Sequence, residues 1–196
     1  MATGLARGWA LCGHKIVFGS REPGSTGHVA EEIGHGATAT DHSAAVRQSE
    51  VVVLAVPYPA VLDMVASLRE DLLGKVVMDV TNPLWTLVPE QSSGAQQVSQ
   101  AIGPGARVVP AFKATFDRIL SEPIDPASGL QRDIFICGDD EDAKAVVGGL
   151  VGDLGFRPVD CGPLSNAMIL DLLVSLIIEV DGAYRKDRAS SWKLLG

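Results

Sequence analysis

A serine and an arginine stand at the end of the first apolar, β-rich run of the chain. The run KIVFGS covers residues 15–20, and Arg21 follows it directly. In a dinucleotide-binding sheet the residue that ends the second strand meets the adenine ribose, where an acid would bind the free 2′-hydroxyl of NAD. Ser20 and Arg21 offer instead a hydroxyl and a planar fork of donors, which suit the 2′-phosphate of NADP. A surface arginine that merely follows a strand is the alternative.

Three later apolar runs also end in residues that suit a nucleotide. They end in AVP (55–57), TNP (81–83) and VPAF (109–112). Ligands of open parallel sheets bind outside the carboxyl ends of the strands. Ala55, Val56 and Pro57 would form a tight apolar turn beside the nucleotide, and Asn82 supplies the donor and the acceptor that a nicotinamide carboxamide requires. A proline can also simply end a strand, so the indication comes from the three ends together.

Strand-like and helix-like segments alternate along the chain, which predicts an α/β protein with a mostly parallel, Rossmann-like sheet. Expected strands lie at 15–20, 36–40, 51–56, 75–80, 107–112, 133–138 and 157–160. Expected helices lie at 1–12, 28–34, 41–50, 59–74, 94–103, from 140 and after 163. The continuous apolar run VVVLAV (51–56) is typical of a parallel strand covered on both faces. We expect a dinucleotide-binding domain over 1–163 and a C-terminal helical segment over 164–196.

Composition argues against several other classes of protein. The 196 residues carry a formal net charge of −8 and no basic stripe, which disfavours nucleic-acid binding. The three cysteines contain no CxxC pair, and the four histidines occur in no metal-ligand pattern, so no metal site is expected. The most apolar run, 168–180, is shorter than the roughly 20 residues that span a bilayer. We therefore expect a cytoplasmic protein without a membrane partner.

The strand ends and the C-terminal half together resemble a known family. The segments KIVFGSREP, VVVLAVPY, KVVMDVTNPL, RVVPAF and GDDEDAKAVV…LGFRPVDCGPL are similar to those of NADP oxidoreductases that use coenzyme F420, a deazaflavin. The reductase domains of membrane metalloreductases belong to the same group. The resemblance extends over nearly the whole chain, and the segment from Gly138 to Leu164 is its most specific part because generic Rossmann domains lack it.

The resemblance implies hydride transfer between NADP(H) and a deazaflavin, with no general acid or base from the protein. It implies that Ser20 and Arg21 hold the 2′-phosphate and that Asn82 and Ala111 flank the nicotinamide. The second ring would lie against Pro83, Phe112 and Lys113. Relatives usually have Asn or His, then Thr, where this chain has Lys113-Ala114. The second substrate therefore stays open among a deazaflavin, a flavin and a small carbonyl compound.

The N-terminal end departs from the family pattern. Relatives begin with a strand and a GxGxxG or GxGxxA turn, and Met1-Ala2 would match only the last two positions of that motif. We expect that this chain starts at an internal methionine of a longer protein. A non-catalytic or impaired nucleotide-binding protein is the alternative function. The terminal apolar helix suits either a homodimer contact or packing within the chain.

Overall fold

Helices and strands alternate as the sequence predicts. The computed structural model describes residues 1–83 and 92–195. Its strands are β1 (Val17–Gly19), β2 (Thr38–Thr40), β3 (Val51–Leu54), β4 (Val76–Asp79), β5 (Arg107–Pro110), β6 (Asp133–Ile136) and β7 (Arg157–Asp160). Its α-helices are α1 (Ala2–Leu11), α2 (Pro23–Ile33), α3 (His42–Gln48), α4 (Tyr58–Ser67), α5 (Arg69–Leu72), α6 (Gly94–Ile102), α7 (Glu141–Asp153) and α8 (Ala167–Ala183).

All strand pairs in the described sheets are parallel, which confirms the predicted α/β class. The strands form three separate sheets, β1–β2, β3–β4–β5 and β6–β7, rather than the single sheet that the sequence pattern indicates. In the central sheet Val51 pairs with Val76, and Val76 pairs with Arg107. Strands β1 and β3 do not hydrogen-bond to each other, because they line opposite sides of an open cleft.

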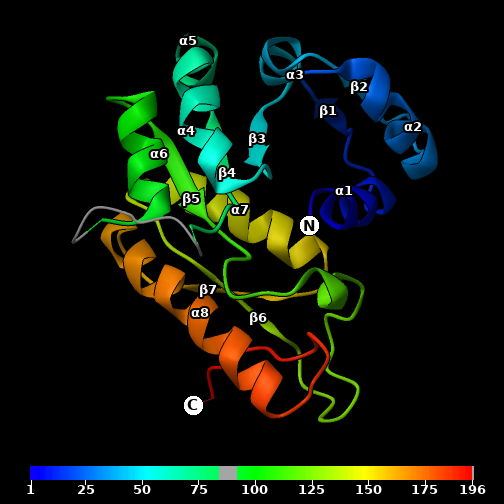
Figure 1. Ribbon diagram of the computed structural model, residues 1–196, viewed down its shortest axis with the longest axis vertical. Helices are drawn as coiled ribbons and strands as arrows, with labels where there is room; N and C mark the ends of the chain where they lie inside the picture. The colour runs from blue at the N-terminus through cyan, green and yellow to red at the C-terminus, as the bar shows by residue number, and fades with distance from the viewer. Residues whose placement is uncertain (84–91, 196) are drawn as a thin grey trace.

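Alternate residues of the central sheet pack on opposite layers of helices. Val51 and Val53 pack in the cluster that contains Leu5 of α1 and Val147 of α7. Val52 and Leu54 pack in the other cluster, with residues of α4 and α6. This is the covering on both faces that parallel sheets require. Figure 1 shows α7 (yellow) behind the sheet, α4 and α6 at the upper left, and the β1–β2 unit with α2 at the upper right.

Local capping signals explain where several helices begin. Asp41 Oδ1 accepts a hydrogen bond from Ala44 N at 2.8 Å, so Asp41 is the N-cap of α3. Helix α2 begins at Pro23, five residues before the predicted start, because proline at the first helical position has its φ already set for a helix. The single helix predicted over 59–74 is interrupted at Leu68, whose φ of −106° and ψ of 10° separate α4 from α5.

The C-terminal helix α8 runs along the lower part of the molecule and packs against α6 (Figure 1). Its buried side is formed by Leu170, Val174 and Ile177. The segment after it returns to β6, where Lys193 Nζ and Leu194 N donate hydrogen bonds to Asp133 at 2.7 and 2.8 Å. This return ties the end of the described chain to the β6–β7 sheet.

Candidate functional site

The predicted site residues follow the carboxyl ends of four strands. Ser20 and Arg21 follow β1, and the 55–57 turn follows β3. Asn82 and Pro83 follow β4, and the 111–113 segment follows β5. Because β3, β4 and β5 are parallel and in register, their ends lie at one edge of the central sheet. The sequence prediction of strand-end positions is confirmed, whereas the contacts assigned to each side chain stay predictions.

Ser20 and Arg21 form the turn between β1 and α2. Ser20 N donates to the Thr40 carbonyl at 3.0 Å, which fixes the turn to β2, and Ser20 Oγ accepts from Glu22 N at 3.1 Å. Arg21 is exposed and makes no ion pair within the described part of the chain. An exposed guanidinium without a carboxylate partner is available to an anionic ligand.

His42, the first residue of α3, is a neighbour that the sequence prediction missed. It lines the cleft together with Gly19. A Cβ on Gly19 would lie 3.2 Å from His42 Nδ1 and 3.1 Å from Ala45 Cβ, so a larger residue would require β1 and α3 to move slightly apart. Burial lowers the pKa of His42, and the positive charge of Arg21 lowers it further. Its position directly after the capping Asp41 was the available signal.

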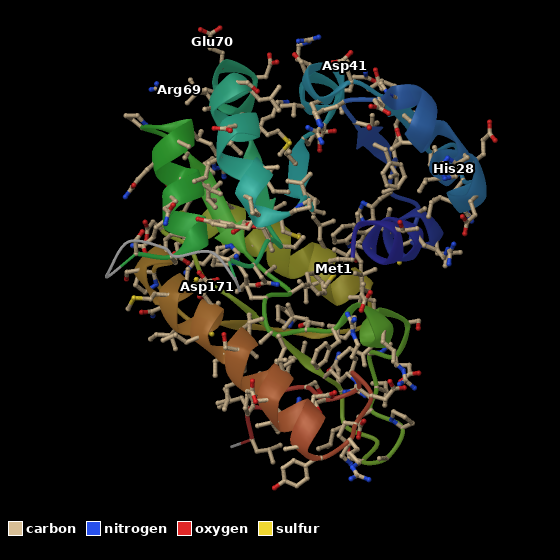
Figure 2. All side chains as sticks on the ribbon, viewed as in Figure 1. Met1, His28, Asp41, Arg69, Glu70 and Asp171 are labelled. Carbon is tan, nitrogen blue, oxygen red and sulfur yellow. The ribbon has the colours of Figure 1, made fainter. Side chains whose placement is uncertain are left out.

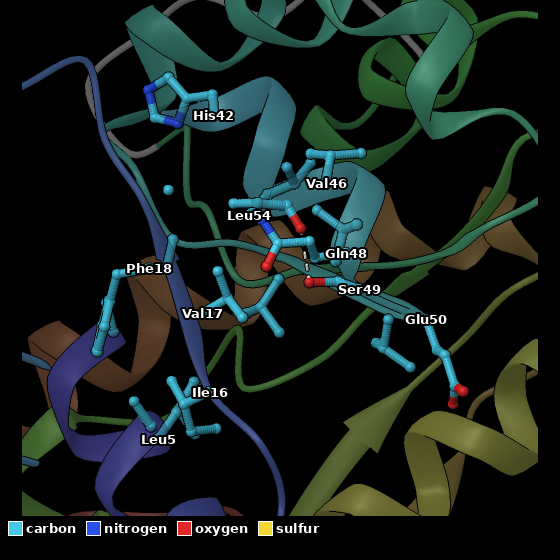
Figure 3. Close-up of a pocket in the computed structure, with 18 of the residues that line it drawn as sticks. Leu5, Ile16, Val17, Phe18, His42, Val46, Gln48, Ser49, Glu50 and Leu54 are labelled. Atoms are coloured by element: carbon cyan, nitrogen blue, oxygen red, sulfur yellow. Dashed lines mark hydrogen bonds between the residues drawn. The ribbon is translucent and has the colours of Figure 1, made fainter. Parts of the chain in front are cut away.

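A cleft of about 530 Å³ lies between β1 and β3. One side is lined by 15–19 and the other by 50–56, with α1 and the helices α3 and α4 contributing the remaining walls. Figure 3 shows Val17 and Leu54 in the middle of this cleft, with His42 at one end and Glu50 at the other. The cleft therefore joins Gly19, next to Ser20, to Ala55 and Val56. The other predicted site residues lie outside its lining.

The cleft explains why β3 is less buried than the sequence predicts. The sequence predicts that VVVLAV is covered on both faces, yet Val51, Val52 and Val53 are only half-buried, while all four residues of β4 are buried. Three consecutive valines in a central sheet are expected to be buried. Their exposure arises because the edge of β3 away from β4 opens onto the cleft.

Asn82 carries an unpaired oxygen at the end of β4. Its Oδ1 is buried and has no hydrogen-bond partner among the described residues, and the same holds for the hydroxyl of Tyr58 at the start of α4. A buried polar atom without a partner is costly and is usually satisfied in the working state of a protein. The carboxamide of a nicotinamide has the N–H donors that such an oxygen accepts, so the orphaned oxygen fits the predicted group.

Behind Asn82 lies a buried group of charges that the sequence prediction did not assemble. Lys113 Nζ lies 2.8 Å from Asp79 Oδ2 and 3.5 Å from Asp171 Oδ1, and it also donates to the Thr81 carbonyl. Asp171 comes from α8, and Figure 2 shows it on the side of that helix that faces α6. Its Oδ2 accepts from Gly94 N, the first residue of α6, at 2.9 Å. Lys113, which follows β5, therefore contacts β4 through Asp79 and α8 through Asp171, and Asp171 in turn bonds to the start of α6.

The attraction between the opposite charges in this group offsets the free-energy cost of burying them. Burial alone would lower the pKa of Lys113, but the two carboxylates outweigh it and raise the pKa. Burial raises the pKa of Asp171, despite the opposing charge of Lys113. It also raises the pKa of the Tyr58 phenol, to which the negative charges of Asp171 and Asp79 add. The available sequence signal was Asp79, a carboxylate inside the apolar run KVVMDV.

Phe112 and Lys113, the two side chains assigned to the second ring, are both buried. The Phe112 side chain is 1% exposed, and its ring packs edge-on between Trp9 and Phe156 at centroid distances of 6.5 and 6.0 Å. Its φ of 55° marks a sharp turn after β5. Lys113 is 3% exposed, and its ammonium group is paired with the carboxylates of Asp79 and Asp171. As positioned here, neither side chain presents a free surface to a second ring.

Neither a metal site nor a membrane-spanning helix occurs in the described residues. No three His, Cys, Asp or Glu side chains of 1–83 and 92–195 gather closely enough to hold a metal ion. In the same ranges, no helix combines the length and the apolar character that crossing a membrane requires.

Comparisons with known proteins agree with this fold. Residues 1–83 match the family model described as NADP oxidoreductase coenzyme F420-dependent. The chain is 29% identical over 191 residues to the F420-dependent NADP reductase of Methanocaldococcus jannaschii, with 88% of this chain and 84% of that one covered.

Two solved structures are similar over most of the chain. The crystal structure of a candidate F420-dependent NADP-reductase from Arthrobacter sp. FB24 superposes with a TM-score of 0.86 over 99% of this chain and 94% of that chain, at 24% identity. That likeness shows the fold. A hypothetical protein of Sinorhizobium meliloti is 31% identical, with a TM-score of 0.70 and coverage of 83% of this chain and 80% of that one.

Proposed function

Because the chain belongs to the family of coenzyme F420-dependent NADP oxidoreductases, we propose that it is an NADP(H)-dependent oxidoreductase acting on a deazaflavin or flavin-like partner. The relatives named F420-dependent NADP reductases support the nucleotide and the class of reaction. Those names and the description of the family model also support a deazaflavin as the second substrate.

The observation that carries the proposal is the unpaired Asn82 oxygen at the end of β4. It lies at the same edge of the central sheet as Ala55 and Ala111, which follow the two neighbouring strands. A nicotinamide at this edge would supply the missing donor, while its ring lies against the small residues of the two flanking strand ends. The exposed Arg21, with Ser20, would bind the 2′-phosphate at the other end of the nucleotide.

The protein's own contribution is position rather than proton transfer. When bound, the nicotinamide supplies the hydride chemistry. In our proposal Ala55, Val56 and Pro57 give the nucleotide close access to the backbone after β3, and Pro83 supports the ring beside Asn82. The buried Lys113 and its two carboxylates connect the ends of β4 and β5 to the start of α6. In our proposal this network keeps the surface under the nicotinamide ring rigid and so fixes the position of the ring.

A non-catalytic nucleotide-binding protein is the second candidate. The observation that favours it is the burial of Phe112 and Lys113, the two side chains assigned to the second ring. Their contact with a second substrate stays a prediction, and it would require both side chains to leave their present positions.

We also propose how the remaining parts of the chain serve this enzyme. Residues 1–163 would form the dinucleotide-binding domain, and 164–196 would pack on it while offering a second face to a homodimer partner. Three cysteines, Cys12, Cys137 and Cys161, are free thiols, which supports a reducing, cytoplasmic setting.

The proposal is tested by separating nucleotide binding from hydride transfer. The purified chain is titrated with NADPH and, in parallel, with NADH while nucleotide fluorescence is followed. Oxidised F420 or FMN is then added and its absorbance recorded. We expect NADPH to bind more tightly than NADH and F420 to be reduced. Binding without transfer to either acceptor would favour the second candidate, and failure of both nucleotides to bind would overturn the proposal.

A further inference from the structure

Cys137 and Cys161 directly follow two neighbouring parallel strands. In the β6–β7 sheet the last register pair is Ile136 with Asp160, and the two cysteines are the next residue of each strand. Cys161 N donates to the Ile136 carbonyl at 2.7 Å, which extends the ladder by one residue. The two cysteines therefore lie side by side, as the register pair that comes after the strands.

The two thiols lie on the same face of this sheet. Cys137 is a buried member of the apolar cluster that contains residues of α4 and α6, and Cys161 packs against the same cluster. The thiols are close enough for the charge of Cys161 to raise the pKa of Cys137. Neighbouring strands lie about 4.8 Å apart, which is within the Cα separation of about 4.4–6.8 Å that a disulfide spans.

Glycines beside the two cysteines permit the closing movement that a disulfide needs. The Cβ atoms of a disulfide lie about 3.8 Å apart, about 1 Å closer than the spacing of two strands. Each cysteine is followed by a glycine, and Gly138 N donates to the Gly162 carbonyl at 2.9 Å. Gly162 has a φ of 87°, which glycine adopts without strain. The chain is therefore adaptable at the point where the two sulfur atoms must approach.

The two thiols differ in their access to solvent. Cys137 is fully buried, whereas Cys161 is half-buried and is the one that a small oxidant can reach. Cys161 Sγ donates only a weak hydrogen bond, to the Val159 carbonyl at 3.6 Å. The third cysteine, Cys12, is exposed and contacts the Asp153 carbonyl instead. An oxidant would therefore react first with Cys161 of this pair, and Cys12 is an independent reference thiol.

We propose that Cys137 and Cys161 form a reversible disulfide when a hydroperoxide reaches Cys161. The Cys161 sulfur attacks the peroxide, the O–O bond breaks, and a sulfenic acid forms at Cys161 while an alcohol or water leaves. The Cys137 sulfur then attacks Cys161 Sγ, so that the S–S bond forms, the S–O bond breaks and a water leaves. The two thiols lose two electrons and two protons, and the hydroperoxide takes up both. The inference does not depend on the proposed enzyme activity.

The surroundings of the pair make this reaction slow at neutral pH. Burial raises the pKa of Cys137 to about 12; the charges of Cys161, Asp160 and Asp171 add to the rise, and Lys113 opposes it. Burial also raises the pKa of Cys161, and Asp160 adds to that rise. Because the thiolate is the nucleophile, the disulfide should form about 10-fold faster at pH 8 than at pH 7.

The test exposes the full chain to hydrogen peroxide at pH 8 and follows its mass. We expect the loss of two hydrogen atoms per chain within the β6–β7 sheet, and a non-reducing digest should contain one species that joins the peptides of Cys137 and Cys161. Dithiothreitol should separate the two peptides again. This digest uses the unaltered chain, so its result does not depend on whether a variant folds.

Three single variants assign the order of the steps. Cys137→Ser removes the second thiol, so the sulfenic acid should persist at Cys161 and be captured by dimedone. Cys161→Ser should abolish the disulfide and leave Cys137 without a dimedone adduct. Cys12→Ser is the matched control and should form the disulfide at the rate of the wild type.

Any one of three results overturns the proposal. The first is a digest in which Cys12 is oxidised but the peptides of Cys137 and Cys161 stay separate. The second is a disulfide that contains Cys12 in place of either partner. The third is oxidation of Cys161 to a sulfinic acid that dithiothreitol does not reverse, which would show that Cys137 does not reach it.

Discussion

Arg21 is the residue on which the choice of nucleotide is proposed to depend. It is exposed, follows β1, and lies close enough to His42 to lower its pKa. Replacing it by alanine removes the charge-assisted bonds to a 2′-phosphate, which are worth about 1.5–3 kcal/mol and so about 10–100-fold in affinity. We expect Arg21→Ala to weaken NADPH binding by that factor and to leave NADH binding unchanged.

The matched control is Arg47→Ala on α3, because Arg47 is paired with Asp71 at 3.2 Å and lies outside the proposed site. Fluorescence titration of both variants with both nucleotides measures the effect. Equal losses for NADPH and NADH, or equal effects of the two substitutions, would argue against a 2′-phosphate at Arg21.

Lys113 is the second residue whose role can be tested singly. Lys113→Met leaves the carboxylates of Asp79 and Asp171 buried without their cation, which should cost about 3–5 kcal/mol of unfolding free energy at neutral pH. The raised pKa of Asp171 sets the sign of the pH dependence. As pH falls, protonation removes a buried charge from the variant, so its deficit relative to the wild type should shrink.

Urea unfolding at a series of pH values between 5 and 8 measures this deficit. Lys186→Met, which changes an exposed lysine after α8, is the control and should be neutral. A deficit that stays constant over that pH range would show that the lysine contributes packing rather than charge.

At the scale of elements, α8 presents two different faces. Its buried side packs against the core through Leu170, Val174 and Ile177, while the side with Met168, Ile169, Leu172 and Leu176 is exposed. Residues three and four positions apart share one face of a helix, so the exposed residues form a continuous apolar stripe. This stripe supports the proposed homodimer contact.

The prediction for this helix is a change of oligomeric state. Leu172→Glu places a charge in the centre of the stripe and should convert a dimer into a monomer in sedimentation-velocity experiments. Val146→Glu, at an exposed apolar position of α7, is the matched control and should leave the dimer intact. A wild-type chain that already sediments as a monomer would refute the homodimer.

The chain end is joined to β6 through one carboxylate. Burial alone would raise the pKa of Asp133, but hydrogen bonds from Arg157, Lys193 and Leu194 N outweigh it and lower the pKa to about 2. Since the folded pKa is below the ordinary value of 3.8, the stabilisation is complete above about pH 4 and is lost as pH falls through 2. The shift corresponds to about 2 kcal/mol.

Asp133→Asn should therefore lose about this much stability at pH 7 and release 191–195 for digestion by a carboxypeptidase. The wild type and the variant should become equally stable only when the pH falls well below the folded pKa of Asp133, which is about 2. Asp187→Asn, which changes an exposed aspartate paired with Arg118, is the control. Unchanged digestion of Asp133→Asn would show that other contacts hold the segment.

At the scale of the whole molecule, the cluster around α2 and β1 buries fewer apolar side chains than the two clusters that cover the central sheet. Among the described residues, the cluster that joins α1, α2 and β1 has three buried members, Ala6, Ala10 and Ile33. Strand β4, by contrast, is buried along its whole length. Regions with few buried apolar contacts open at lower free energy than the core.

Native-state hydrogen exchange should therefore show Val17–Gly19 exchanging at least about 100-fold faster than Val76–Asp79. Mass spectrometry of peptic fragments resolves the two segments. Equal protection would mean that the chain unfolds as one cooperative unit and that the cleft does not divide it.

The sequence determined the order and type of the elements because those signals are local. Asp41 caps α3, apolar runs form strands, and the strand ends carry Ser20, Asn82 and Ala111 as expected. What it could not supply was partnership over long distances. The tertiary structure decided three such partnerships. It places β1 and β3 on opposite sides of a cleft and packs Phe112 between Trp9 and Phe156. It also brings Lys113 to Asp171 of α8. Such contacts depend on which surfaces and charges can be buried together, and the spacing of residues along the chain does not encode that choice.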